Sequence, residues 1–252
     1  MLARFKHRSY ELEHLDRGDY TPEEYEGCIV ELQLVNEWLG DARTLKHTLL
    51  KEVGRSALRK FSILDVGAGS GELLRVAALW AREKHLEFSG VGLELNERSA
   101  RAISEESTAF PNIESIRGDA RSLPFSDGEF DYVMCSLFTH HFVELEIINI
   151  LREMSRVASR SIFVIDLHRH AIAYYFYTTV GKLFLHNRLL REDGALSILR
   201  SFKRAELREL AAEAGLRDAN VTRHFPYRLV LSAPANVSPL NQQQPTVAER
   251  AA

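Results

Sequence analysis

Cysteine is scarce in this chain of 252 residues, which contains only Cys28 and Cys135. Two cysteines so far apart argue against a disulfide framework and a cysteine-rich zinc site, so we expect reduced, buried thiols and a cytoplasmic location. The chain also lacks any run of about 18 uncharged apolar residues, so we expect no membrane-spanning helix. Its first ten residues carry Arg4, Lys6 and Arg8 without an apolar segment behind them, so we expect no signal peptide.

An excess of positive charge is missing as well. The 32 Lys and Arg residues are balanced by 35 Asp and Glu residues, and the net charge is −3 at pH 7. This balance excludes a protein that binds nucleic acid through bulk positive charge, although it is compatible with a local basic patch. Hydrophobic residues make up 45% of the chain, which is enough to build a globular core in one large domain or two small ones.

Short β-type segments alternate with amphipathic helical segments through most of the chain. Strands are expected at residues 61–66, 88–95, 113–117, 130–137, 161–166, 219–225 and 227–233. Helices are expected at residues 72–82, 97–108, 143–157 and 203–214, and residues 168–190 are expected to be mostly helical. Strands that alternate with helices predict an α/β fold in which helices cover both faces of a parallel sheet.

The composition divides the chain into three parts. Residues 1–55 have helical periodicity and are expected to form an N-terminal lid. Residues 56–233 hold the alternating pattern, with a helical insertion at 168–200. Residues 234–252 are rich in Pro, Gln, Ala and Asn and are expected to be disordered.

The most informative segment is LDVGAGSGEL at residues 64–73. A buried strand leads into Gly67, Gly69 and Gly71, where the missing Cβ atoms let a ligand approach the backbone and the next helix directs its N–H groups. A dinucleotide fingerprint, G-x-G-x-x-G, would need a third glycine where Glu72 stands. An acidic residue there disfavours a pyrophosphate. Together with Asp65 it favours a ligand that carries an ammonium group, such as S-adenosylmethionine (SAM).

This segment resembles motif I of the class I SAM-dependent methyltransferases. Three further motifs follow in the order of that family: VGLE at 91–94, GDA at 118–120 and FDYVMCS at 130–136. The resemblance covers about residues 61–233 and implies a Rossmann-like, seven-stranded, mostly parallel sheet with SAM as cofactor. It implies that Glu94 binds the ribose hydroxyls and that Asp119 lies near the adenine amine. The full set of implied cofactor residues is Asp65, Gly67, Ala68, Gly69, Gly71, Glu94, Leu95, Asp119, Ala120 and Ser136.

Shorter segments narrow the resemblance. VNEWLG at 35–40, FTHHF at 138–142 and IDLHR at 165–169 are similar to a bacterial subgroup of small-molecule methyltransferases. Members of that subgroup often accompany polyketide or quinone-type biosynthesis, which implies a phenolic hydroxyl as the acceptor. Methyl transfer from a sulfonium is an in-line displacement, so the acceptor has to be positioned. A phenol has a pKa near ~10, so a general base assists the reaction at neutral pH.

His140 and His141 are the candidates for that base. They follow the fourth expected strand, where the resemblance places the sulfur of the cofactor. A histidine titrates near ~6.5 and can accept a phenolic proton. Because the two are adjacent in sequence, we expect one of them to face the site. The alternative is that they cap the following helix or pack in an interface.

Five further residues are candidates for the acceptor pocket. Arg169 and His168 follow the fifth expected strand, and Arg169 has the chemistry to hold a carboxylate or a phenolate. Tyr25, Trp38 and Tyr175 have the flat apolar surface that would suit an aromatic acceptor. Each has a structural alternative, which is an ion pair or helix cap for Arg169 and core packing for the aromatic residues.

Other chemistries find less support in the sequence. No cluster of acids and histidines has the spacing of a metal site, so we expect none. Cys135 lies in a buried strand without a neighbouring proline, which favours packing over covalent catalysis. We therefore expect O-methylation of a small phenolic or quinol-like acceptor, with no nucleic-acid partner. C-methylation of an activated ring carbon, a non-catalytic SAM-binding protein, an NAD-dependent oxidoreductase, a protein substrate and a homodimer remain open alternatives.

Overall fold

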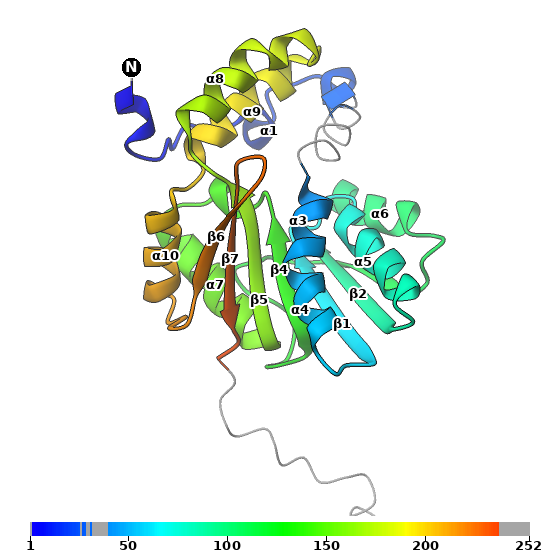
Figure 1. Ribbon diagram of the computed structural model, residues 1–252. Coiled ribbons are helices and arrows are strands. Elements are labelled where there is room, and N and C mark those ends of the chain that lie inside the picture. The colour runs from blue at the N-terminus through cyan, green and yellow to red at the C-terminus, as the bar shows by residue number, and fades with distance from the viewer. Residues whose placement is uncertain (1, 26, 29–30, 32–39, 237–252) are drawn as a thin grey trace, which may run out of the picture.

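The computed structural model describes residues 2–25, 27–28, 31 and 40–236, and its seven strands form one sheet (Figure 1). The strands are β1 (Lys60–Val66), β2 (Glu87–Glu94), β3 (Ile113–Arg117), β4 (Phe130–Ser136), β5 (Ala158–Leu167), β6 (Asn220–His224) and β7 (Arg228–Pro234). Their spatial order is β3-β2-β1-β4-β5-β7-β6. Strands β1 to β5 pair in parallel, and β7 is antiparallel to both of its neighbours. The predicted α/β fold with a mostly parallel, seven-stranded sheet is confirmed.

Helices cover both faces of this sheet (Figure 1). One face carries α3 (Asp41–His47), α4 (Leu49–Arg55), α5 (Glu72–Glu83) and α6 (Glu97–Glu106), and the other carries α7 (Glu144–Val157) and α10 (Arg204–Glu213). The alternation of side chains along β1 separates the two cores. Phe61 and Ile63 pack on the first face, while Leu64 and Val66 pack on the second. Apolar residues at successive positions therefore bury a strand on both sides, as a central parallel strand requires.

A third layer of helices lies above the carboxyl edge of the sheet, at the top of Figure 1. It contains η1 (Leu2–Phe5), α1 (His14–Arg17), α8 (Ala171–Thr179), η3 (Gly181–Leu183) and α9 (Arg188–Arg200). We call residues 2–17 and 171–200 the cap. In the cap, Leu185, Leu189 and Leu190 pack against Cys28 in a small core of their own.

The structure divides the expected lid of residues 1–55 between two places. Residues 2–17 join the cap, whereas α3 and α4 bury Leu45, Leu49 and Val53 against the sheet. The expected insertion at 168–200 supplies the rest of the cap. The expected disordered tail lies outside the described residues from 237 onward, while Pro234 ends β7. Within the described ranges, we find no helix that is both long enough and apolar enough to cross a bilayer.

Candidate functional site

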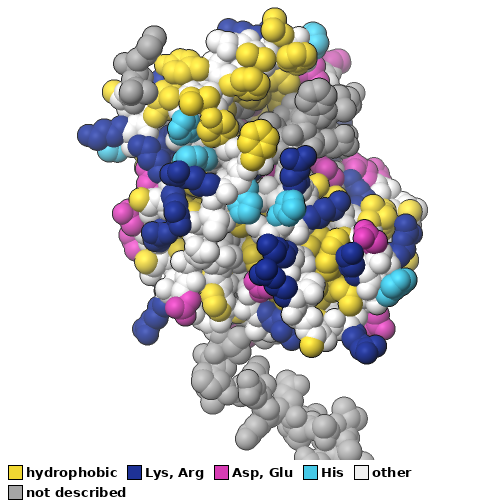
Figure 2. All heavy atoms as spheres, in the orientation of Figure 1, with side chains coloured by type: hydrophobic (Ala, Val, Ile, Leu, Met, Phe, Trp, Pro, Cys, Tyr) yellow, Lys and Arg dark blue, Asp and Glu magenta, His cyan; other side chains and the backbone are white. Residues whose placement is uncertain are grey.

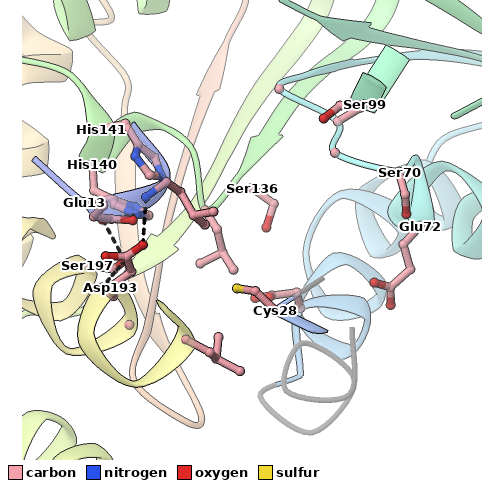
Figure 3. A pocket seen from close by; sticks show the side chains of 18 of the residues that line it. Glu13, Cys28, Ser70, Glu72, Ser99, Ser136, His140, His141, Asp193 and Ser197 are labelled. Carbon is pink, nitrogen blue, oxygen red and sulfur yellow. Dashed lines mark hydrogen bonds and ion pairs between the residues drawn. The ribbon is translucent and has the colours of Figure 1, made fainter. Parts of the chain in front are cut away.

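A cavity of about 590 Å³ lies between the carboxyl edge of the sheet and the cap (Figure 3). It lies where the strand order reverses between β1 and β4, which is the usual ligand position in open α/β sheets. Its volume is in the range of small-molecule sites. The cofactor half of the cavity is lined by Asp65, Gly67, Ala68, Gly69, Ser70, Glu72, Ser99 and Ser136. The acceptor half is lined by Glu13, Leu15, Tyr25, Cys28, His140, His141, Tyr177, Leu190, Asp193, Ser197 and Ile198.

The glycine loop after β1 turns the backbone toward the cofactor half. Gly67, Gly69 and Gly71 have φ angles of 72°, 59° and 80°, in the left-handed region that side chains disfavour. A Cβ at Gly67 would lie 2.3 Å from the ring of Phe138, so this position has to be glycine for packing as well. A Cβ at Gly69 would meet nothing within 4 Å, so this part of the loop faces open space.

Asp65, the next-to-last residue of β1, is a buried acid without a full set of partners. Its side chain is only 2% exposed, and its Oδ1 atom has no hydrogen-bond partner. Burial raises the pKa of Asp65 to about 8, and the nearby carboxyl of Glu94 adds to the increase. Among the described side chains only three buried polar atoms lack a partner, and two of them, Asp65 Oδ1 and Ser136 Oγ, line this cavity. These two atoms and the open space at Gly69 fit the amine-bearing SAM that the resemblance implies.

The remaining predicted cofactor residues lie farther along the sheet edge. Glu94 ends β2, and its Oε1 accepts a hydrogen bond of 2.7 Å from the backbone N–H of Gly69. Leu95 is 60% exposed, and Ala120 is buried in the sheet core. Asp119 accepts hydrogen bonds from the side chain of Arg121, which lowers the pKa of Asp119. The structure thus joins Glu94 to the loop through Gly69. The predicted cofactor residues that do not line the cavity are Gly71, Glu94, Leu95, Asp119 and Ala120.

His140 and Asp166 form a buried pair at the other end of the cavity. Leu137 follows β4 with a φ of 50°, and the turn leads into η2 (Thr139–His141), which lies beside the end of β5. There Nδ1 of His140 lies 2.6 Å from Oδ1 of Asp166. Oδ2 of Asp166 accepts hydrogen bonds from the hydroxyl of Thr139 and from the backbone N–H of His140.

The charge state of Asp166 fixes the tautomer of the histidine. Burial would raise the pKa of Asp166, but the charge and hydrogen bond of His140 and the hydroxyl of Thr139 outweigh it and lower the pKa to about 2. An ionised carboxylate only accepts hydrogen bonds, so Nδ1 of His140 carries the proton. The other ring nitrogen, Nε2, lies 3.9 Å from Glu13 Oε1 in the acceptor half (Figure 3).

Acids of the cap surround both histidines. His141 is half-buried, and its Nδ1 lies 3.3 Å from the carboxylate of Asp16. Glu13 accepts a hydrogen bond from Ser197, and burial raises the pKa of Glu13. Among the described residues, Glu13, His140 and His141 are the one group whose potential metal ligands all lie within 4.8 Å of one another. Arg200 lies 3.9 Å from Glu13 and 2.9 Å from Asp16, so a guanidinium already supplies positive charge here. The expected absence of a bound metal stays a prediction.

The structure distinguishes among the predicted aromatic residues of the acceptor pocket. Tyr25 lines the cavity. In the aromatic run of α8, Tyr177 lines the cavity, whereas Tyr175 packs edge-on against the ring of Phe5, 5.9 Å away. Trp38 lies outside the described residues. Tyr177, two positions after Tyr175 on the same helix, thus takes the place in the cavity lining that was predicted for Tyr175.

Arg169 and His168 do not line the cavity. The guanidinium of Arg169 is buried and donates hydrogen bonds to the backbone carbonyls of Phe5 and Ser201 and to the carboxylate of Glu206. It therefore ties the N-terminal segment to the rest of the chain instead of facing an acceptor. Burial lowers the pKa of His168 to about 4, so this histidine is neutral at pH 7.

Two arginines that the sequence did not indicate hold the histidine turn. Arg8 donates through Nη2 to the carbonyl of His140 at 3.2 Å. Arg200 donates through Nε to the same carbonyl and through Nη2 to the carbonyl of His141 at 2.6 Å. Glu13 also belongs to this previously unrecognised group. No local motif marks these residues, because their partners lie far away in the chain.

Comparison with known proteins agrees with this geometry. Residues 63–161 match a family model described as a methyltransferase domain. The chain is 29% identical over 143 residues to a demethylmenaquinone methyltransferase of Staphylococcus carnosus, covering 52% of this chain and 58% of that protein. It is 36% identical over 74 residues to a ubiquinone/menaquinone biosynthesis C-methyltransferase of Rickettsia prowazekii, covering 28% of this chain and 30% of that protein. The chain therefore spans less than two thirds of the length of these relatives.

The fold has close counterparts among solved structures. A SAM-dependent methyltransferase from Aquifex aeolicus superposes with a TM-score of 0.57 at 18% identity, covering 79% of this chain and 92% of that chain. At this identity the superposition concerns the fold. The family model thus places a methyltransferase domain in residues 63–161, as the resemblance in the sequence implies, and the superposition agrees with the predicted fold.

Proposed function

We propose that this chain, whose residues 63–161 match the methyltransferase domain, transfers a methyl group from SAM to a small phenolic or quinol-like acceptor. One observation carries the proposal: a single cavity has the unpaired Asp65 in one half and His140, oriented by Asp166, in the other. The first group suits a cationic ligand. The second suits a group that has to lose a proton.

The cofactor half has the chemistry to hold SAM. Asp65 and Ser136 would bind the methionyl amine, because each has a buried oxygen without a partner. Glu94 would bind the ribose hydroxyls from its place beside Gly69. SAM supplies an electrophilic methyl group when bound.

His140 is the proposed general base. Asp166 accepts a hydrogen bond from Nδ1–H, so Nε2 of the neutral imidazole would accept the proton of an acceptor hydroxyl. The ionised Asp166 would then stabilise the imidazolium that forms, as a buried carboxylate does in catalytic triads. His141 is the alternative base, since it also lines the cavity and its Nδ1 faces Asp16.

The walls of the acceptor half favour an apolar acceptor without a negative charge. Leu15, Leu190 and Ile198 give apolar surface, and Tyr25 and Tyr177 add aromatic rings. The same half also contains the buried carboxyl groups of Glu13 and Asp193. These acids would repel an acceptor that carries a carboxylate, because like charges are costly where water is excluded.

The methylated atom has two candidates. A phenolate shares its negative charge between the oxygen and the ortho ring carbons, so one base prepares both for attack. O-methylation is the proposal that the resemblance in the sequence favours. C-methylation is the second candidate, because one matched relative carries that activity in its name. A cytoplasmic location and a homodimer stay predictions.

A methyl-transfer assay tests the proposal directly. The purified chain would be incubated with methyl-labelled SAM and a panel of phenols and quinols, with and without a chelator, and the products identified by NMR. We expect labelled product that is independent of chelation, with Asp65→Asn weakening SAM binding and His140→Gln slowing turnover. SAM binding without product from any acceptor would favour a non-catalytic SAM-binding protein, and NADH binding without SAM binding would refute the cofactor. Loss of turnover on chelation, restored by a divalent cation, would assign His140 to a metal instead of to a proton.

A further inference from the structure

The outer surface of the cap is apolar although it faces solvent. Seven of the nine residues of α8 are apolar or aromatic, and none of the nine is buried. Ile172 and Phe176 are each 61% exposed, and Leu183 and Phe184, just beyond the helix, are 74% and 66% exposed. Ile172 and Phe176 are four residues apart and therefore share one face of α8, while Leu183 belongs to the short helix η3 that follows. Figure 2 shows hydrophobic side chains gathered over the cap at the top of the view. We call Ile172, Phe176, Leu183 and Phe184 the cap patch.

The chain segments that form and flank the cap patch carry positive charge, although the carboxylate of Glu31 accepts hydrogen bonds from the backbone of His186 and Asn187 nearby. Residues 167–191 contain no Asp or Glu, although the chain as a whole has a net charge of −3. Lys182 lies within the patch sequence and is exposed. The first ten residues also lack acids, and the guanidinium of Arg4 lies 4.5 Å from the ring of Tyr174 on α8. Positive charge from two separate segments therefore flanks one apolar surface.

We propose that the cap patch docks the protein on the surface of an anionic phospholipid bilayer. Exposed apolar side chains gain free energy when they enter the boundary between headgroups and acyl chains. Lys182 and Arg4 would at the same time approach negatively charged headgroups, each adding to the affinity. A contiguous apolar surface on a monomer otherwise carries a risk of aggregation, which is why its presence indicates a binding site.

The position of the patch connects this surface to the cavity. The same helix that presents Ile172 and Phe176 to solvent lines the acceptor half with Tyr177. The helix that carries the cap patch is therefore also a wall of the acceptor half. The docking proposal goes beyond the proposed methyl transfer and does not depend on it, since binding to vesicles is measured without any acceptor.

Co-sedimentation with lipid vesicles tests the proposal. The full chain would be mixed with vesicles of phosphatidylcholine alone or of phosphatidylcholine with phosphatidylglycerol. We expect stronger binding to the anionic vesicles that weakens as salt is added. The double variant Phe176→Ser/Phe184→Ser should lower the partition coefficient about tenfold or more, because two apolar anchors are lost. Lys182→Glu should lower it about tenfold on anionic vesicles and little on neutral ones.

Leu79→Ser is the matched control, because Leu79 is 46% exposed on α5, away from the cap. SAM titration and thermal melting would establish that each variant is folded. The proposal is overturned if the wild-type chain binds neither vesicle, or if Leu79→Ser weakens binding as much as the double variant. Equal binding to both vesicles would overturn the electrostatic part. A dimer seen by light scattering that dissociates in the double variant, without vesicle binding, would instead assign the patch to contact between copies of the chain.

Discussion

Two buried aspartates at the carboxyl edge of the sheet are in opposite chemical states. Asp65 of β1 has an oxygen without a partner, and its pKa is raised to about 8. Asp166 of β5 is bonded to His140 and Thr139, and its pKa is lowered to about 2. The two are 2% and 0% exposed, so burial does not distinguish them, whereas the available partners do. The comparison teaches that the chain itself satisfies the acid in the acceptor half but leaves the acid in the cofactor half to a ligand.

Removing the histidine partner of Asp166 should have the largest effect. His140→Ala is expected to lower kcat by about 10²–10⁴-fold, which is the range for loss of a general base, and to leave the Kd for SAM unchanged. Asp166→Asn should lower kcat about 100-fold, because an amide would no longer stabilise the imidazolium. The measurements are steady-state turnover and calorimetric titration with SAM. His141→Ala is the control, and a larger loss there than in His140→Ala would assign the base to His141.

Substituting Asp65 should affect binding instead of turnover. Asp65→Asn is expected to raise the Kd for SAM about 10- to 100-fold, as expected for loss of a charge-assisted hydrogen bond, with kcat at saturating SAM nearly unchanged. SAM binding to the wild-type chain at pH 7 should also release protons, because the bound cation favours ionised Asp65. Calorimetry in two buffers of different ionisation enthalpy measures this release. Equal proton release by wild type and Asp65→Asn would contradict the assignment, and Asp127→Asn, at an exposed position, serves as the control.

The two acids should also affect stability in opposite directions without any ligand. The folded pKa of Asp65 is raised, so its contribution is complete below pH ~4 and is lost as the pH rises through about 8. Asp65→Asn should therefore melt higher than the wild type at pH 9 by about 5 °C or more. The folded pKa of Asp166 is lowered, so Asp166→Asn should melt lower at neutral pH, by an amount that shrinks as the pH falls toward 2. Thermal melting at several pH values checks both signs, and parallel curves for all three proteins would refute them.

The smallest effects test how separate the two halves of the cavity are. A Cβ at Gly67 would displace Phe138, which precedes the histidine turn, so Gly67→Ala should change both the Kd for SAM and kcat by several-fold. Gly69 faces open space, so Gly69→Ala should cost only the strain of a left-handed residue, about 1–2 kcal/mol of stability, and weaken SAM binding alone. Turnover and binding of the two variants make the comparison. An effect of Gly69→Ala on kcat that matches that of Gly67→Ala would show that the halves are not separable.

The sequence predicted the cofactor half better than the acceptor half, for a physical reason. The glycine loop, Asp65 and the strands are local features whose spacing sets their conformation, and the observed strand ends agree with the expected ones within three residues. The acceptor half combines Glu13, His140 and Ser197, which only the folded chain brings together. Local patterns hold no information about such long-range contacts.

Two predicted acceptor residues that do not line the cavity, Arg169 and Tyr175, show the same lack of long-range information in the sequence. Arg169 was expected to face the acceptor because it follows a strand, but the carbonyl of Phe5 comes from the other end of the sequence and engages it. Tyr175 belongs to a helix with apolar residues on every side, and such a helix has no polar face to indicate which side points inward. The structure shows that Tyr177 is the inward residue.

The arginine contacts of the cap connect the covering of the cavity with the position of His140. Arg8 reaches from the N-terminal segment to the carbonyl of His140 and to the backbone of Arg200, which holds the same carbonyl. The segment that covers the cavity is therefore also a support of His140, the proposed general base. Any opening that lifts residues 2–17 also removes Arg8 and Glu13 from the surroundings of His140. Under the proposed function, exposure of the cavity to water and a correctly held base would therefore exclude each other.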